Sequence, residues 1–241
     1  MAEGDKKVVS EKKRVVKFLV WVGIDVGIMV LLAVLLLWRP GGFHSPEVAE
    51  TDEVSSYLTH VLAPAVYNGV GKGVAFEVKI DEAGINEVVS QMGWPRAEGE
   101  VLLLTPAVTF LEGEVKIMAT AMVRGVELVV TVIARPAVNS EGLLETGVEG
   151  IYIGAMNVTP IARMVGKRTY EENFAAFEEV SEGVVDLRDW GAVVAKGIFM
   201  DEAIEPVIRI DDETARIISI EAVEGKMVIG FEPVRPERGK F

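Results

Sequence analysis

The sequence predicts an α+β fold in which an N-terminal transmembrane helix precedes a largely antiparallel sheet packed on two or three helices. Three observations predict it. A long apolar run lies near the N-terminus, several segments alternate apolar and polar residues between glycine turns, and a few segments repeat apolar residues at helical spacing.

The transmembrane helix is predicted over residues 18–38, a run of 21 residues with one charge, Asp25. A helix of this length spans about 31 Å, the thickness of a bilayer's hydrocarbon core. Fourteen of the residues are Leu, Val, Ile or Phe, and together they favour insertion by on the order of 4–8 kcal/mol. Asp25 lies off centre and opposes insertion by at most about 3.5 kcal/mol, so we expect the helix to insert.

Charge around this run predicts its orientation. Six Lys or Arg residues precede it closely, and only Arg39 follows closely. By the positive-inside rule, we expect a single pass through the cell membrane, with the N-terminus cytoplasmic and the C-terminal domain outside the cytoplasm. The run is too long for a signal-peptide core, and no A-x-A-like site follows it, which favours a retained anchor. The expected division is a basic tail (1–17), the helix (18–38), a stalk linker (39–50) and an extracytoplasmic domain (51–241).

The chain beyond residue 39 is strongly acidic, with 17 Lys or Arg against 33 Asp or Glu. Binding to nucleic acid needs cationic surface, so this composition excludes that class of partner. Anionic headgroups should repel the domain, so any contact with lipid must be mainly apolar. The absence of cysteine excludes disulfides, thiolate metal sites and cysteine nucleophiles.

Apolar periodicity predicts the remaining elements in order. Helices are expected over 51–68, 81–92 and about 160–180, with Pro64 kinking or ending the first. Strands are expected over 74–81, 101–111, 114–123, 126–138 and 143–154, with a loop over 93–100. Residues 184–200 leave helix and strand open. A strand over 205–210 then precedes a hairpin of ARIISIEAV and KMVIGFEPV, joined by an EG turn.

Motifs for chemistry are weak throughout. The loop AVYNGVGKG lacks the first glycine and the Ser or Thr of a phosphate-binding loop. Only His44 and His60 could serve a catalytic triad, and no second ligand accompanies His60 at helical spacing. Asp211, Asp212 and Glu213 lack the spacing of a calcium loop. We therefore expect no enzyme activity, no metal site and no cofactor, although a hydrolase using carboxylates stays as the least favoured reading.

The membrane run contains a small-residue pair, Gly23 and Gly27, at the spacing that lets two helices approach closely in lipid. This pair could form a homodimer seam. Asp25 lies off that face and could bind another membrane protein, since charges inside membranes often have functions. Both features are also compatible with a simple anchor, and the residues leave the choice open.

The strand VELVVTVIA (126–134) is apolar on both faces, so something must cover each face. The second face carries Val129 and Ile133, and the neighbouring strand adds Met118 and Met122, a residue type that lines adaptable apolar surfaces. Helices 81–92 and 160–180 could cover this face fully; otherwise a ligand or partner covers part of it. The candidates for a ligand groove are Val88, Met92, Met118, Met122, Val129 and Ile133.

A resemblance to a known family bears on whether helices or a ligand cover this second face. The runs FEVKIDEAGINEVVSQM, VTFLEGEVKIMATAMVRG, VELVVTVIARPAV and GLLETGVEGIYIGAMNVTP, within residues 74–165, resemble membrane-anchored bacterial proteins related to the tubular lipid-binding (TULIP-like) group. Shared features are a strand that enters a short helix carrying Asn86, long hairpins, and a small-residue turn at Gly154 before Pro160. The resemblance implies a curved sheet wrapped around a helix, with an apolar groove for acyl chains.

Two functions from different classes are compatible with these patterns. The first is a membrane-anchored, non-catalytic module of the cell envelope that binds lipid or another apolar ligand in a sheet-and-helix groove. The second is an anchored assembly or scaffold protein whose domain docks envelope proteins through the same apolar face. The partners expected are the membrane itself, a lipid, and an envelope protein or a second copy of the chain.

Overall fold

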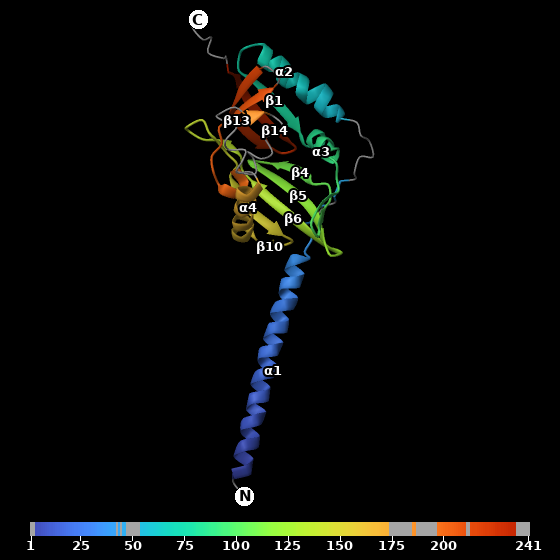
Figure 1. Cartoon of the computed structure of the whole chain (residues 1–241), viewed down its shortest axis with the longest axis vertical. Coiled ribbons are helices and arrows are strands. Elements are labelled where there is room, and N and C mark those ends of the chain that lie inside the picture. Colours follow the sequence, from blue (N-terminus) through green and yellow to red (C-terminus); the bar gives the residue numbers. More distant parts are fainter. Residues whose placement is uncertain are drawn as a thin grey trace.

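A computed structural model describes residues 3–41, 43, 45–46, 54–173, 185–186, 197–210 and 213–234. Figure 1 shows one long helix, α1 (Glu3–Leu36), projecting from a folded domain of sheets and shorter helices. Within α1, Val16–Leu36 is long and apolar enough to cross a membrane. The predicted α+β class is confirmed: an N-terminal apolar helix precedes antiparallel sheets and a few helices.

The first predicted helix of the domain contains a local irregularity. It consists of a π-helical turn, η1 (Leu58–Leu62), followed by α2 (Ala63–Gly71). Pro64 explains the π turn, because a proline has no N–H to donate and its ring crowds the carbonyl four residues earlier. The amide of Ala63 accordingly reaches back five residues to the carbonyl of Leu58. Two further helices are α3 (Glu82–Ser90) and α4 (Thr159–Asn173), and residues 197–200 are also helical.

One sheet joins the start and the end of the domain. It has five strands in the order β1-β14-β13-β12-β11. Their bounds are β1 Phe76–Asp81, β11 Val185–Asp186, β12 Val207–Ile210, β13 Glu213–Val223 and β14 Lys226–Pro233. All neighbours are antiparallel except β11 and β12, and the predicted C-terminal hairpin is confirmed as β13–β14.

The second sheet has seven strands in the order β10-β9-β6-β5-β3-β2, with β4 also paired to β5. Their bounds are β2 Arg96–Glu98, β3 Val101–Leu103, β4 Ala107–Leu111, β5 Glu114–Val123, β6 Val126–Ala134, β9 Val148–Ile153 and β10 Met156–Asn157. A separate two-stranded piece pairs β7 (Ala137–Val138) with β8 (Leu144–Glu145).

Prolines explain where this sheet departs from prediction. The strand predicted over 101–111 is split into β3 and β4 before Pro106, and the strand predicted over 126–138 is split into β6 and β7 at Pro136. A proline cannot donate to a ladder, so pairing stops or restarts beside it. The loop predicted over 93–100 is wrong in part, because β2 pairs with β3 there.

The larger core lies between the two sheets. Val78 and Phe231 of the five-stranded sheet pack in one cluster with Phe110 and Val115 of the seven-stranded sheet, and all four side chains are buried. Two turns also meet across this seam. The amide of Gly225 donates to the carbonyl of Phe110 at 3.0 Å, and the amide of Gly113 donates to the carbonyl of Ala222 at 2.8 Å. Each glycine thus bonds the residue three positions before the other glycine.

A polar cluster fixes η1 against β1 and α3. Ser55 caps the helix by accepting from the amide of Leu58 at 3.2 Å. The carboxylate of Glu87 accepts from the amide of Tyr57 at 3.1 Å and from the hydroxyl of Ser55 at 2.8 Å. These two donors hold the pKa of Glu87 below its ordinary value, because they bond the charged carboxylate. The Tyr57 ring lies against Gly84, where any β-carbon would overlap it.

Candidate membrane-proximal surface

The seven-stranded sheet has an inner and an outer face. The inner face carries Val132 and Ile151, which are paired across β6 and β9 and pack with Val158 at the start of α4. Near the other end, Phe110 and Val115 pack on the five-stranded sheet. The inner face is therefore covered by α4 at one end and by the second sheet at the other.

The outer sheet face is formed by the alternate residues of β5 and β6. In the register of these strands, Met118 lies opposite Thr131, Thr120 opposite Val129, Met122 opposite Glu127 and Lys116 opposite Ile133. Successive side chains of a strand point to opposite faces, so four of the predicted groove residues share this face. They are Met118, Met122, Val129 and Ile133.

Burial on the outer sheet face is greatest along the middle of β6. Val129 is 5% exposed and Thr131 is 6% exposed, whereas Met118, Met122 and Ile133 are half-buried. Neither core cluster formed by the described residues includes any of these five side chains. Among the hydrogen bonds of the described chain, the buried Thr131 hydroxyl oxygen has no partner. The middle of the face is mainly apolar and encloses the Thr131 hydroxyl, while Lys116 and Glu127 lie toward its two ends.

The two helices expected to cover this face lie elsewhere. α4 packs on the inner face through Val158 and Ala162. α3 packs along the edge strand β4, where Asn86 accepts from the amide of Val108 and donates to its carbonyl, each at 2.7 Å. A side-chain amide can pair with an edge strand in this way because it offers one donor and one acceptor side by side. Within the described residues, α3 and α4 therefore do not form the cover expected from helices 81–92 and 160–180; residues 174–180 lie outside the described residues.

Val88 and Met92 stand apart from the other predicted groove residues. Val88 lies one turn beyond Ile85, which packs with the core cluster between the sheets. Met92 follows the end of α3 and is 53% exposed. The structure thus places Val88 on α3 and Met92 just after it, and the four others on the outer sheet face.

The end of α1 is bonded to the seven-stranded sheet. The amide of Ala155, in the turn between β9 and β10, donates to the carbonyl of Leu35 at 2.8 Å. Gly154 adopts a φ of +60°, and a β-carbon there would overlap the carbonyl oxygens of Leu35 and Leu36. Arg39 forms an ion pair with Glu127, next to Met122 in the register. The domain therefore caps the helix end, where carbonyls otherwise lack partners.

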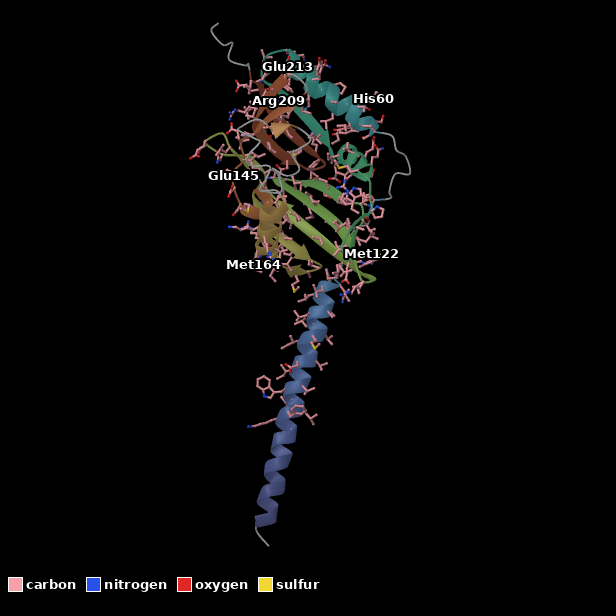
Figure 2. All side chains as sticks on the ribbon, in the orientation of Figure 1. His60, Met122, Glu145, Met164, Arg209 and Glu213 are labelled. Carbon is pink, nitrogen blue, oxygen red and sulfur yellow. The ribbon has the colours of Figure 1, made fainter. Side chains whose placement is uncertain are left out.

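This contact places one end of the outer sheet face beside the anchor. In Figure 2, Met122 lies at the end of the domain nearest α1, on the hairpin that β5 forms with β6. The stalk also lies against the sheet rather than hanging free along its whole length, since Ser45 donates to the carbonyl of Thr105 at 2.8 Å. Sequence patterns did not reveal either contact, because both join segments far apart in the chain.

Gly23, Asp25 and Gly27 all lie on the free length of α1. Side chains here are exposed, and a β-carbon at either glycine would meet nothing within 4 Å. The two glycines therefore leave a shallow surface open for a neighbouring helix, as the spacing predicts. Binding of a second helix at this surface stays a prediction.

Other candidates for chemistry form no site in the described structure. His60 is exposed on η1, with Nδ1 2.9 Å from the hydroxyl of Thr59. Asp211 and Asp212 lie outside the described residues, as does His44. Across the described ranges, no three His, Asp or Glu side chains gather in a way that could hold a metal ion.

Comparison with known proteins gives no assignment. No protein-family model matches the sequence. No curated protein matches it either. The resemblance to the TULIP-like group therefore stays a prediction, and the apolar surface beside the anchor is the remaining guide to function.

Proposed function

We propose that this protein is a single-pass, membrane-anchored extracytoplasmic module that binds lipid or another apolar ligand without covalent chemistry. The site is the outer sheet face, which replaces the sheet-and-helix groove expected from sequence. The observation that carries the proposal is the bond between Ala155 and Leu35, because it fixes this apolar face against the end of the anchor. A ligand leaving the bilayer would meet Met122 first and then pass along β5 toward Met118.

The chemistry of the face suits an acyl chain. Methionine side chains are flexible and polarizable, so Met118 and Met122 can adapt to a chain without a fixed shape. Ile133, which is half-buried, supplies rigid apolar surface beside them, whereas Val129 is already covered within the fold.

A second function is favoured by one observation. In the described chain, α3 and α4 both pack away from the outer sheet face, so neither forms the wall of a groove. A half-buried, mainly apolar face also suits docking of another envelope protein. An anchored assembly or scaffold protein is therefore the alternative.

Native mass spectrometry of the full chain, purified in mild detergent, tests the first function. The test variant carries Met118→Gln and Met122→Gln, which keep the side-chain length but add a polar amide. The control variant carries Val61→Gln, at an exposed position of η1 remote from this face. Lipid held only by α1 remains in all three proteins, so the difference between them reports on the outer sheet face.

We expect the wild type and the control to retain more phospholipid than the double variant. Equal retention by all three proteins, before and after incubation with phospholipid, would contradict a lipid site on this face. Docking is then the remaining proposal, and site-directed crosslinking from Met118 in intact cells tests it.

A further inference from the structure

The first two turns of α4 present an apolar stripe away from the protein. Ile161, Met164 and Val165 are 60%, 69% and 54% exposed. They recur at three- and four-residue spacing, so they share one side of the helix. The opposite side faces the domain, where Ala162 packs on the inner sheet face and Gly166 lies against the Phe199 ring. These three side chains will be called the α4 stripe.

The α4 stripe lies close to the anchor. Ile161 lies only six positions after Ala155, which bonds the last turn of α1. Figure 2 places Met164 at the end of the domain nearest α1, on the opposite side of the sheet from Met122. Trp38 is exposed and lies two residues past the apolar span. Because tryptophan is enriched at membrane–water interfaces, Trp38 indicates that this end of the domain lies at the interface.

The charged residues that follow the α4 stripe are compatible with a position of α4 in the membrane interface. Lys167 and Arg168 follow the α4 stripe directly and are exposed. The domain as a whole is acidic, so apolar insertion must supply most of the contact. Apolar residues followed by basic ones on an exposed helix side are typical of helices that lie in the membrane interface.

We propose that the α4 stripe inserts into the interface of the same bilayer that α1 crosses, and forms a second membrane contact for the domain. The inference rests on the anchoring by α1 and is independent of any ligand on the outer sheet face. With α1 on one side and α4 on the other, the edge of the seven-stranded sheet that includes Gly154 would rest on the headgroups.

The chain has no cysteine, so single cysteines can carry a fluorophore at chosen positions of the full-length protein. Met164→Cys places an environment-sensitive label in the α4 stripe. Met29→Cys labels the apolar span as a positive control, and Tyr67→Cys labels an exposed position of α2 as a negative control. Each protein is reconstituted in phosphatidylcholine vesicles containing lipid with a nitroxide near the headgroup end of its acyl chain.

We expect the label at 164 to be quenched about twofold more than the label at 67, because an interfacial helix buries its apolar side roughly 5–10 Å deep. If Met164→Cys folds poorly, Ile161→Cys replaces it with the same expectation. Equal quenching at 164 and 67 would overturn the second contact. An unquenched label at 29 would overturn the anchoring itself.

The result is separable from lipid binding on the outer sheet face. Introducing Met118→Gln and Met122→Gln into the protein labelled at 164 should leave its quenching unchanged, because those residues lie on the other face of the sheet. A loss of quenching in that background would mean that the signal came from the outer sheet face, and would count against the α4 stripe.

Discussion

The amide of Ala155 donates a hydrogen bond to the carbonyl of Leu35, which joins the turn between β9 and β10 to the last turn of α1. Helix ends carry carbonyls without intrahelical partners, and in a membrane protein such groups must be satisfied where water is scarce. The folded domain supplies one of these partners itself. The position of the domain relative to the helix axis is therefore set by a specific contact.

Replacement of Gly154 by alanine should break this contact. The residue has a φ of +60°, and the added methyl group would overlap the carbonyl oxygens of Leu35 and Leu36. We expect a loss of about 1–3 kcal/mol in the stability of the contact. Hydrogen exchange measures it, since the Ala155 amide should exchange slowly in the wild type and much faster in the variant. Gly125→Ala is the matched control, because Gly125 has a φ of +82° but open space around it.

Glu87 should make stability depend on pH. Its folded pKa lies below the ordinary value of 4.5, chiefly through the amide of Tyr57 and then through the Ser55 hydroxyl. A lowered folded pKa stabilises the protein above the unfolded pKa, and this contribution is lost as the pH falls through the folded pKa. Urea unfolding of Glu87→Gln should therefore lose part of the acid sensitivity of the wild type below pH 4.5. A variant with an unchanged acid slope would disprove this role, and Glu77→Gln on the exposed side of β1 serves as the control.

Gly84→Ala should destabilise the same region by steric overlap. An added β-carbon would meet the Tyr57 ring, whose hydroxyl also accepts from the amide of Asp81 at 2.9 Å. Moving the ring costs about 1–3 kcal/mol, as overpacking usually does. Thermal unfolding compares this variant with the control Gly71→Ala, where the added methyl group meets nothing within 4 Å. Alanine also favours a helix more than glycine does, so the control should not be destabilised. Similar melting temperatures for the two variants would show that the Tyr57 contact is unimportant.

Thr131→Val should stabilise the protein when no ligand is bound. The hydroxyl oxygen is buried without a partner, and valine has the same shape without the polar atom. Removing an unsatisfied buried group typically recovers about 1–3 kcal/mol. Denaturant unfolding measures the gain against Thr120→Val. Thr120 has similar burial on the same face, but its hydroxyl is not among the buried groups that lack a partner in the described chain. Destabilisation by Thr131→Val would show that the hydroxyl makes a bond in solution.

Local patterns predicted the local structure well. The apolar run over 18–38 identified α1, the alternation in VELVVTVIA identified β6, and the EG turns identified two hairpins. The shared face of Met118, Met122, Val129 and Ile133 also followed from the period of two. These features depend only on residues close together in the sequence.

The contacts that define the surface could not be predicted in this way. Nothing in α4 distinguishes the inner from the outer face of the sheet, because both faces of β6 are apolar. The position of Val88 depends on Asn86 bonding Val108, which lies 22 residues away. The contact of Ala155 with Leu35 joins even more distant segments. Pairing between remote segments is set by the whole fold.

The paired turns at Gly113 and Gly225 have a mechanical consequence. Their reciprocal bonds tie the tips of two hairpins from different sheets, at the seam where Phe110 is enclosed. Neither sheet can swing away from the other without breaking both bonds and exposing that ring to water. The domain should therefore melt in a single cooperative step, and a force applied through the anchor should be transmitted to both sheets at once.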